Sequence, residues 1–285
     1  RGGQEVSVMV DFLQASGINV LFCIGGDGTQ RGTHAIAEEA LRRDAGIAVV
    51  GIPKTIDNDI SYVDRTFGFN TAITEASKVL DCAHVEARGA PNGIGLVKLM
   101  GRDSGFIAAG ATLASQEVNF CLVPEVPFSL DGPDGFLALL KARMQRKQHA
   151  LVVVAEGAGQ HLFEQERQRD PNANAPYNDI GLLLKDRIRA YFADEGQEVN
   201  VKYIDPSYII RSVPANADDS LFCDRLARQA VHAALSGRTD MLVGSIHRSL
   251  IHVPIPMATQ TRKKLDPEGF AWISVHETTG QPLKF

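Results

Sequence analysis

The sequence predicts an α/β protein in which two Rossmann-like lobes each carry a mainly parallel sheet. Short apolar runs alternate with stretches of helical periodicity along most of the chain, the pattern expected of β-strands joined by crossover helices. The apolar runs are continuous, as in strands that helices cover on both faces. A chain of 285 residues with 44% hydrophobic residues is long enough to build two lobes with large cores.

The expected strands and helices alternate along the chain. Strands are expected at 19–26, 46–53, 92–100, 119–125, 149–157 and 241–247. Helices are expected at 6–17, 29–46, 71–89, 106–115, 136–147 and 223–237. The polar segment 159–179 contains Pro and Asn and is interpreted as a long surface loop or a short frayed helix. In such sheets the functional residues are expected in loops that follow the carboxyl ends of the strands.

Composition argues against several classes of function. The net charge of −5 disfavours general nucleic-acid affinity, so any anion site has to be local. We find no apolar run of about eighteen residues and no signal-type N-terminus, so a membrane partner is not indicated and a cytoplasmic protein is expected. The four cysteines lie far apart without CxxC spacing; we expect them to be reduced and mostly buried.

The first motif that carries chemistry is GGDGTQ at Gly25–Gln30, between an expected strand and helix. Its glycines allow close backbone approach to a phosphate, and the amides at a helix start favour an anion. Asp27 adds a carboxylate oxygen, and Mg²⁺ is typically held by one or two carboxylates together with phosphate oxygens. The alternative is a glycine turn with a capping aspartate.

The second motif is PKTIDND at Pro53–Asp59, directly after an expected strand. Asp57 and Asp59 would share a face in an extended segment, whereas in a turn they could take different roles. One carboxylate could accept a hydroxyl proton while the other holds a metal or orients its neighbour, and Lys54 could neutralise a phosphoryl group in transfer. The alternative is an Asx-rich turn with solvated charges.

Three further motifs place polar side chains after expected strands. Arg102 in KLMGRDSGFIA follows a glycine at the end of an expected strand, where its guanidinium could pair with a phosphate. The alternative is that Arg102 forms a surface salt bridge. Glu156 in VVVAEGAG could accept hydrogen bonds from sugar hydroxyls or simply cap a helix. Tyr208 and Arg211 in DPSYIIRS suit a sugar phosphate, against the alternative of packing plus a peripheral charge. Neither HExxH nor GxSxG occurs, so zinc-protease and acyl-transfer chemistry have no support.

Taken together, these motifs resemble the phosphofructokinase family. The match runs in order through GGDGTQ, GIPKTIDNDI, RTFGFNTA, LMGRDSG, VPE, VVAEGA and DPSYIIRS, over about residues 20 to 230. NAD kinases and diacylglycerol or sphingosine kinases carry loops similar to GGDGT, whereas TIDND together with MGR is typical of the sugar kinases. The resemblance implies the phosphofructokinase fold and transfer of a phosphoryl group to the C1 hydroxyl of fructose 6-phosphate.

The resemblance also implies roles for individual residues. Asp57 would be the base that takes the C1 proton, Asp59 its supporting partner, and Lys54 and Arg102 the cations beside the transferred group. Asp27 would hold Mg²⁺. The implied substrate contacts are Thr55, Asp59, Met100, Gly101, Arg102, Glu156, Tyr208 and Arg211. The implied nucleotide contacts are Arg1, Gly26, Asp27, Gly28 and Thr29.

Two positions bear on the phosphoryl donor. Gly28 leaves room for the α-phosphate of ATP, where pyrophosphate-using relatives usually have a second Asp. Lys54 points the other way, because pyrophosphate enzymes have Lys there and many bacterial ATP enzymes have Gly. The combination resembles the ATP-dependent enzymes of trypanosomatids and plants, so we expect ATP. A pyrophosphate-dependent enzyme and a noncatalytic sugar-phosphate-binding subunit are the alternatives.

The resemblance finally implies an organisation of the chain. A nucleotide-binding lobe is expected from 1–70 and 224–262, and a fructose 6-phosphate-binding lobe from 71–223 and 263–285. Members of the family carry a strand and a glycine loop upstream of GGDG, so we expect the N-terminal part of the first lobe to be missing from this sequence. A homodimer or homotetramer is expected.

Overall fold

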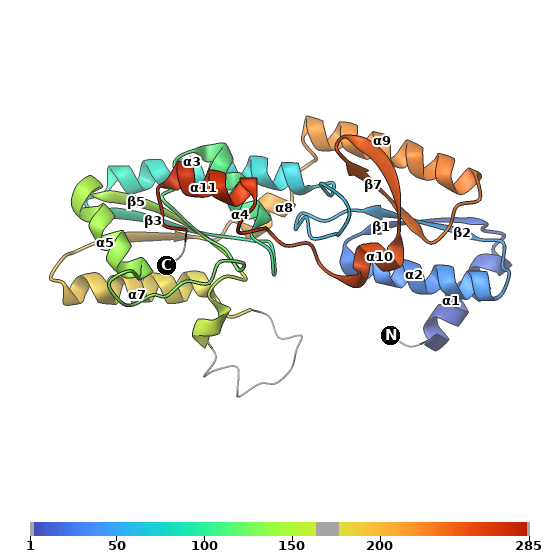
Figure 1. Cartoon of the computed structure of the whole chain (residues 1–285), viewed down its shortest axis with the longest axis horizontal. Coiled ribbons are helices and arrows are strands. Elements are labelled where there is room, and N and C mark those ends of the chain that lie inside the picture. Colours follow the sequence, from blue (N-terminus) through green and yellow to red (C-terminus); the bar gives the residue numbers. More distant parts are fainter. Residues whose placement is uncertain (1–2, 164–176, 284–285) are drawn as a thin grey trace. The chain divides into compact units, whose positions relative to one another are not determined.

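The computed structural model describes residues 3–163 and 177–283, which divide into two compact units (Figure 1). Unit 1 comprises Arg1–Thr71 and Ala215–Lys263, and unit 2 comprises Ala72–Pro214 and Lys264–Phe285. The chain therefore passes between the units three times. Each unit carries one four-stranded sheet, of which one is wholly and the other largely parallel. The predicted α/β class is confirmed.

Unit 1 is built on a sheet with the strand order β1-β2-β7-β8, in which only β8 runs antiparallel to its neighbour. Its strands are β1 (Val20–Gly25), β2 (Ala48–Pro53), β7 (Met241–Ile246) and β8 (Ser249–Pro254). Its helices are α1 (Gly3–Ala15), α2 (Asp27–Arg42), α9 (Ala217–Leu235) and α10 (Ile255–Gln260).

Helices cover both faces of this sheet (Figure 1). Val49 of β2 packs with residues of α1 and α2, while its neighbour Val50 packs with Leu226 of α9. Successive side chains of a strand point to opposite faces, and both valines are fully buried. The continuous apolar run of β2 follows from this double coverage.

Unit 2 is built on a wholly parallel sheet with the order β4-β5-β3-β6. Its strands are β3 (Gly93–Leu99), β4 (Phe120–Leu122), β5 (His149–Ala155) and β6 (Asn200–Ile204). Its helices are α3 (Phe69–Gly89, which begins at the end of unit 1), α4 (Phe106–Ser115), α5 (Phe136–Lys147), α7 (Ile180–Asp194), α8 (Ser207–Arg211), α11 (Phe270–Thr279) and the 3₁₀ helix Gln160–Phe163. In Figure 1, α3, α4 and α11 lie on one face of the sheet and α5 and α7 on the other.

Close backbone approach holds α3 against β3. A Cβ atom on Gly93 would lie 2.0 Å from the carbonyl oxygen of Ala87, and one on Gly95 would lie 3.1 Å from that of Ala83. These positions accept only glycine without movement of the helix. The two glycines of the run NGIGLVKLM thus set how closely the helix packs on the central strand.

Several elements were not predicted from the sequence. The helices α7 and α11 and the strands β6 and β8 were not among the expected elements. The apolar residues Ile180, Leu184, Ile188 and Phe192 of α7 do recur at helical spacing and are buried, so the signal for this helix was present and was missed. Helix α9 begins at Ala217, six residues before the expected start at 223, because the Asn216 side chain accepts a hydrogen bond from the amide of Asp219 (2.9 Å) and caps it. Residues 164–176 of the polar segment lie outside the described part of the chain.

The four cysteines are free, as expected, but the prediction that they are mostly buried is wrong. Cys121 is buried in β4, whereas Cys82 is exposed on α3 and Cys23 and Cys223 are half-buried. The helical positions of Cys82 and Cys223 fall beside the apolar stripe that faces the sheet rather than within it. The single Trp272 is buried, at 1% exposure, in α11.

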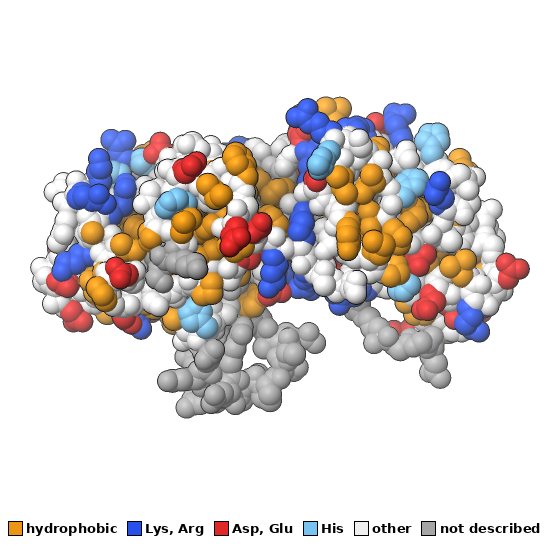
Figure 2. All heavy atoms as spheres, viewed as in Figure 1, with side chains coloured by type: hydrophobic (Ala, Val, Ile, Leu, Met, Phe, Trp, Pro, Cys, Tyr) orange, Lys and Arg blue, Asp and Glu red, His pale blue; other side chains and the backbone are white. Residues whose placement is uncertain are grey.

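Among the described residues, no helix has the length and apolar character needed to cross a membrane. On the face that Figure 2 presents, acidic and basic side chains are interspersed over each unit.

Candidate active site

The motifs singled out in the sequence all follow the carboxyl ends of strands. In unit 1, GGDGTQ leaves β1 and opens α2, while PKTIDND leaves β2. In unit 2, Met100–Arg102 follow β3, Glu156 follows β5, and Asp205–Arg211 follow β6. Because β1 neighbours β2, and β3 lies between β5 and β6, the loops of each unit gather at one edge of its sheet. The motifs therefore lie where the sequence analysis expected them, in loops after the carboxyl ends of the strands.

The two loops of unit 1 are in direct contact. The amide of Lys54 donates to the carbonyl oxygen of Gly25 (3.0 Å), and a Cβ atom on Gly26 would lie 3.4 Å from that of Thr55. The buried side-chain amide of Gln30 donates hydrogen bonds to the carbonyl oxygens of Gly25 (3.0 Å) and Ile52 (3.1 Å), and so it connects β1 to β2. The glycine loop and the TIDND segment are therefore held together as one structure.

TIDND forms a turn rather than an extended segment. Asn58 has a φ of 55°, and its side-chain oxygen accepts a hydrogen bond from the amide of Thr66 (3.0 Å). The hydroxyl of Thr55 accepts one from the amide of Asp57 (3.1 Å). Asp57 is half-buried, while Asp59 is buried at 6% exposure. The two carboxylates thus lie in different surroundings, which is the arrangement under which they could take different roles.

Arg262 joins the two loops through their carboxylates, and sequence reasoning missed it. Its Nη2 lies 3.3 Å from Oδ2 of Asp27, and its Nε lies 3.8 Å from Oδ2 of Asp59. Arg31, one turn along α2, lies 3.1 Å from the same Asp27 oxygen. A bridge between Ile60 and Arg262 brings this distant segment to the site. The only sequence signal was the basic run RKK, which is typical of a solvated surface.

Lys263, the residue after Arg262, also holds the TIDND turn through hydrogen bonds. Its amide donates to the carbonyl oxygen of Asp59 (2.9 Å), and its ammonium donates to those of Val63 (2.8 Å) and Asp64 (2.9 Å). Burial disfavours the charged form and lowers the pKa of Lys263 to about 8, although Asp64 and Asp59 oppose the shift.

Asp27 and Asp59 could hold a hard divalent cation. The guanidinium of Arg262 contacts both carboxylates, so the two are close enough for a metal ion to lie between them. Within 3–163 and 177–283, no three His, Cys, Asp or Glu side chains are grouped so that they could hold a metal ion. A site with two carboxylates suits Mg²⁺ that completes its shell with water and phosphate oxygens rather than a closed protein cage.

In unit 2, Glu156 fixes the backbone of the MGR loop. Its Oε1 accepts hydrogen bonds from the amides of Arg102 (2.8 Å) and Gly101 (3.3 Å). The loop is tight, because Gly101 has a φ of 141° and Arg102 one of 51°, and a Cβ atom on Gly157 would lie 2.1 Å from the carbonyl oxygen of Arg102. The carboxylate therefore aims the exposed Arg102 side chain, and its second oxygen is available for another donor.

Tyr208 and Arg211 lie one turn apart on the short helix α8. The guanidinium carbon of Arg211 is 5.0 Å from the centre of the Tyr208 ring, within the range of a cation–π contact. Both side chains are exposed, Tyr208 at 75%. Their exposure argues against a packing role and leaves the hydroxyl and guanidinium accessible to a ligand.

The predicted site residues divide between the two units. Those in unit 1 are Gly26, Asp27, Gly28, Thr29, Lys54, Thr55, Asp57 and Asp59. Those in unit 2 are Met100, Gly101, Arg102, Glu156, Tyr208 and Arg211. The predicted nucleotide contact Arg1 lies outside the described residues.

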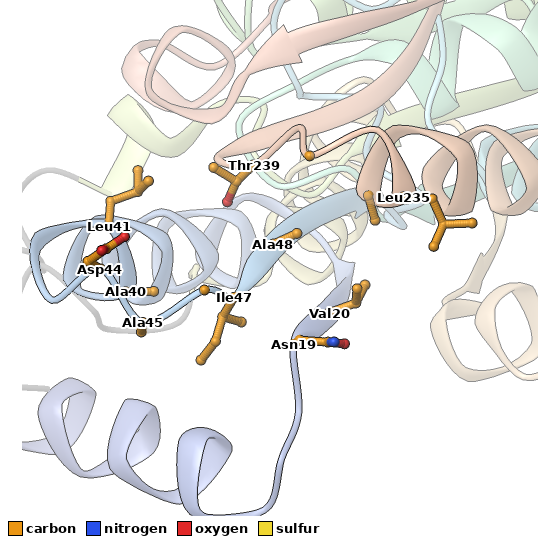
Figure 3. A pocket seen from close by; sticks show the side chains of 13 residues that line it. Asn19, Val20, Ala40, Leu41, Asp44, Ala45, Ile47, Ala48, Leu235 and Thr239 are labelled. Carbon is orange, nitrogen blue, oxygen red and sulfur yellow. The ribbon is translucent and has the colours of Figure 1, made fainter.

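A separate hollow in unit 1 lies at the amino ends of β1 and β2 (Figure 3). Its lining includes Val20 and Ala48, the first residues of these strands, together with Leu41, Leu235 and Thr239. The glycine loop and the TIDND turn are at the opposite ends of the same strands. None of the predicted site residues lines the hollow.

A family model described as Phosphofructokinase matches residues 2–234. The chain belongs to the phosphofructokinase family. The resemblance carried by GGDGTQ, TIDND and MGR is thereby confirmed.

Relatives include the ATP-dependent 6-phosphofructokinase of Borreliella burgdorferi, which is 51% identical over 290 residues, covering 99% of this chain and 65% of that protein. The ATP-dependent 6-phosphofructokinase of Trypanosoma cruzi is 47% identical over 282 residues, covering 98% of this chain and 58% of that protein. The expected kinship with the trypanosomatid enzymes is confirmed. The chain spans less than two thirds of the length of both relatives.

A solved pyrophosphate-dependent phosphofructokinase from Marinobacter aquaeolei matches the structure with a TM-score of 0.77 and 21% identity. The match covers 99% of this chain and 72% of that chain. At this identity the likeness establishes the fold, and the predicted phosphofructokinase fold is confirmed.

Proposed function

We propose that this protein acts as an ATP-dependent 6-phosphofructokinase, which transfers the γ-phosphoryl group of ATP to the C1 hydroxyl of fructose 6-phosphate and yields fructose 1,6-bisphosphate. The observation that carries the proposal is the contact between the glycine loop and the TIDND turn, where Gly26 lies against Thr55. A helix start that favours phosphate thus adjoins a turn with two carboxylates in different surroundings. This combination suits phosphoryl transfer, in which positioning and charge neutralisation supply most of the catalysis.

Asp57 is proposed as the general base. Its backbone is fixed by the hydroxyl of Thr55, and its half-buried carboxylate can accept the proton of a C1 hydroxyl. Asp59, buried beside Arg262, supports the charge balance of the turn. Lys54, exposed next to the glycine loop, neutralises charge on the transferred group.

Asp27 is proposed to hold Mg²⁺, and its setting fits that role. The carboxylate is 7% exposed and occupies the first residue of α2, where backbone amides also attract phosphate. Gly26, Gly28 and Thr29 would contact the phosphates of ATP, and we keep Arg1 as a further predicted contact. Bound Mg²⁺ would neutralise negative charge on those phosphates.

Unit 2 is proposed to bind fructose 6-phosphate. Met100, Gly101 and Arg102 would contact the substrate and the transferred group, with the loop held by Glu156. The second carboxylate oxygen of Glu156 would accept a hydrogen bond from a sugar hydroxyl. Tyr208 and Arg211, which lie one turn apart on α8, would bind the sugar phosphate, for which a guanidinium is well suited. As the family resemblance implies, we propose a cytoplasmic homodimer or homotetramer.

A specific observation favours a second candidate, the pyrophosphate-dependent enzyme. Lys54 is the residue that the resemblance associates with pyrophosphate as donor, and it lies beside the glycine loop. Gly28 favours ATP, because a Cβ atom there would have no neighbour within 4 Å, so the loop leaves open space at this position.

A two-donor assay tests the proposal. Purified protein is incubated with fructose 6-phosphate, MgCl₂ and either ATP or pyrophosphate, and ³¹P NMR follows formation of fructose 1,6-bisphosphate. We expect product with ATP only. Product with pyrophosphate alone would establish the second candidate, and binding of fructose 6-phosphate without turnover from either donor would indicate a noncatalytic subunit.

Removal of the Arg262 charge is expected to strengthen binding of a free divalent cation. In Arg262→Gln the carboxylates of Asp27 and Asp59 lose a shared guanidinium, which competes with metal for the same oxygens. The gain should be about three- to tenfold, since partly exposed ion pairs contribute about 1 kcal/mol. Titration with Mn²⁺ by electron paramagnetic resonance measures it without turnover.

The matched control for this prediction is Arg228→Gln, which removes the exposed ion pair between Arg228 and Asp224 (2.8 Å) on α9. Its Mn²⁺ affinity should equal that of the unmodified protein. An Arg262→Gln affinity equal to that of the control would contradict metal binding between the two carboxylates.

A further inference from the structure

Lys98 lies at the centre of a charged network in unit 2 that the proposed roles do not use. Its ammonium lies 2.7 Å from Oδ2 of Asp179 and 2.9 Å from Oδ2 of Asp205, and its side chain is only 13% exposed. The register of the sheet explains one contact. Pairing between β3 and β6 ends at Val97 and Ile204, so Lys98 and Asp205 are the next neighbours along the two strands.

Asp205 connects this network to the helix that carries Tyr208 and Arg211. The Asp205 carboxylate, which forms the ion pair with Lys98, also accepts hydrogen bonds from the backbone amide of Ser207 (3.1 Å) and from the Ser207 hydroxyl. Ser207 is the first residue of α8. The carboxylate therefore fixes the start of the helix with respect to the carboxyl end of β3.

Asp179 connects the network to α7. One of its oxygens accepts hydrogen bonds from the amides of Gly181 (2.9 Å) and Leu182 (3.1 Å) and caps the helix. The hydroxyl of Tyr203 donates to the same carboxylate (3.0 Å). Lys98 thus holds two loops that come from distant parts of the chain.

The charges of the network are mutually dependent. Burial disfavours the Lys98 ammonium, but its hydrogen bonds to Asp179 and Asp205 outweigh burial and raise its pKa. Burial likewise opposes ionisation of Asp205, but Ser207 and Lys98 lower its pKa. Loss of the lysine would leave two neighbouring carboxylates that repel each other.

We propose that Lys98 is a positioning residue for the sugar phosphate, which it serves by holding Ser207–Arg211 against the carboxyl end of β3. The inference rests on the proposed function, in which Tyr208 and Arg211 bind that phosphate. Lys98 itself does not touch the ligand. It also lies two residues before Met100, so one cation sets the relative positions of the MGR loop and of α8.

Lys98→Met tests the inference. The methionine fills a similar volume without the charge, and the released α8 should raise the KM for fructose 6-phosphate about tenfold or more, because small displacements of binding groups are costly. The KM for ATP and kcat should stay within about twofold, as expected when an interaction with one substrate is lost equally in the ground and transition states. A role in folding alone would not produce this separation.

The matched control is Lys202→Met, which removes another lysine of the same sheet from an exposed ion pair with Glu86. It should leave both KM values unchanged. Asp205→Asn is the second variant, since asparagine can still accept from Ser207 but loses the ionic contact with Lys98. It should raise the KM for fructose 6-phosphate even if Lys98→Met does not fold.

The outcomes separate the inference from the proposed function. If the unmodified protein binds fructose 6-phosphate without turnover, the proposed function fails. The inference can then still be tested, because calorimetry compares the affinities of Asp205→Asn and Lys202→Met for fructose 6-phosphate. Equal affinities in those two variants, by KM or by calorimetry, would overturn the positioning role. Absence of any fructose 6-phosphate binding would overturn both.

Discussion

Asp57→Asn is expected to lower kcat by about two to four orders of magnitude, the usual contribution of a general base. Asparagine has nearly the same shape as aspartate but cannot take the proton of the C1 hydroxyl. The turn should persist, because the hydrogen bond to the hydroxyl of Thr55 uses the backbone amide of residue 57. Dissociation constants for fructose 6-phosphate, measured by calorimetry, should remain within about threefold of the unmodified value, since the proposed phosphate contacts are in unit 2.

Asp59→Asn is the comparison that distinguishes the two carboxylates. Asp59 is buried and lies beside Arg262 and the amide of Lys263, so its loss should reduce stability and lower kcat less than the loss of Asp57. Thermal unfolding of both variants separates stability from catalysis. If Asp57→Asn retained turnover, or if Asp59→Asn lost more of it in a folded protein, the assignment of the base would be wrong.

The parts of the site that could be predicted from the sequence are those formed by contiguous motifs. GGDGTQ and PKTIDND each contain their own glycines, turn residues and carboxylates, and each directly follows an apolar strand. Their contact across β1 and β2 follows from the parallel pairing of consecutive strands, which aligns Gly25 with Pro53. Local chemistry and a simple sheet rule were sufficient here.

The parts that could not be predicted depend on contacts between distant segments. Arg262 reaches Asp27 across an interval of 235 residues, and nothing in the RKK run distinguishes it from a solvated basic surface. In the sequence, Lys98 is one polar residue in an apolar run that predicts a strand. Its ion pair with Asp205 depends on the pairing of β3 with β6, which the sequence did not indicate. Strand β6 itself, NVKYI, is short and has a single buried residue, Val201, among exposed and half-buried ones, so its hydrophobic pattern was too weak to indicate a strand.

Gly28→Asp is expected to reduce ATP-dependent turnover by about a hundredfold or more. An additional carboxylate in the glycine loop would occupy the space expected for the α-phosphate and repel it, and close like charges cost several kcal/mol. The substitution should not harm the fold. A Cβ atom at Gly28 has no neighbour within 4 Å, and this glycine is absent from the positions with positive φ. An acidic residue in the first turn of α2 also interacts favourably with the helix dipole.

Gly32→Asp is the matched control, because it introduces the same side chain at an open position one turn further along α2. Its ATP kinetics should stay close to those of the unmodified protein. Steady-state assays with ATP and with pyrophosphate, at saturating fructose 6-phosphate, compare the two variants. Equal ATP turnover in Gly28→Asp and Gly32→Asp would show that the α-phosphate does not lie at Gly28. Pyrophosphate use that persists in both variants would instead identify Lys54 as the better indicator of the donor, since Lys54 is unchanged in either protein.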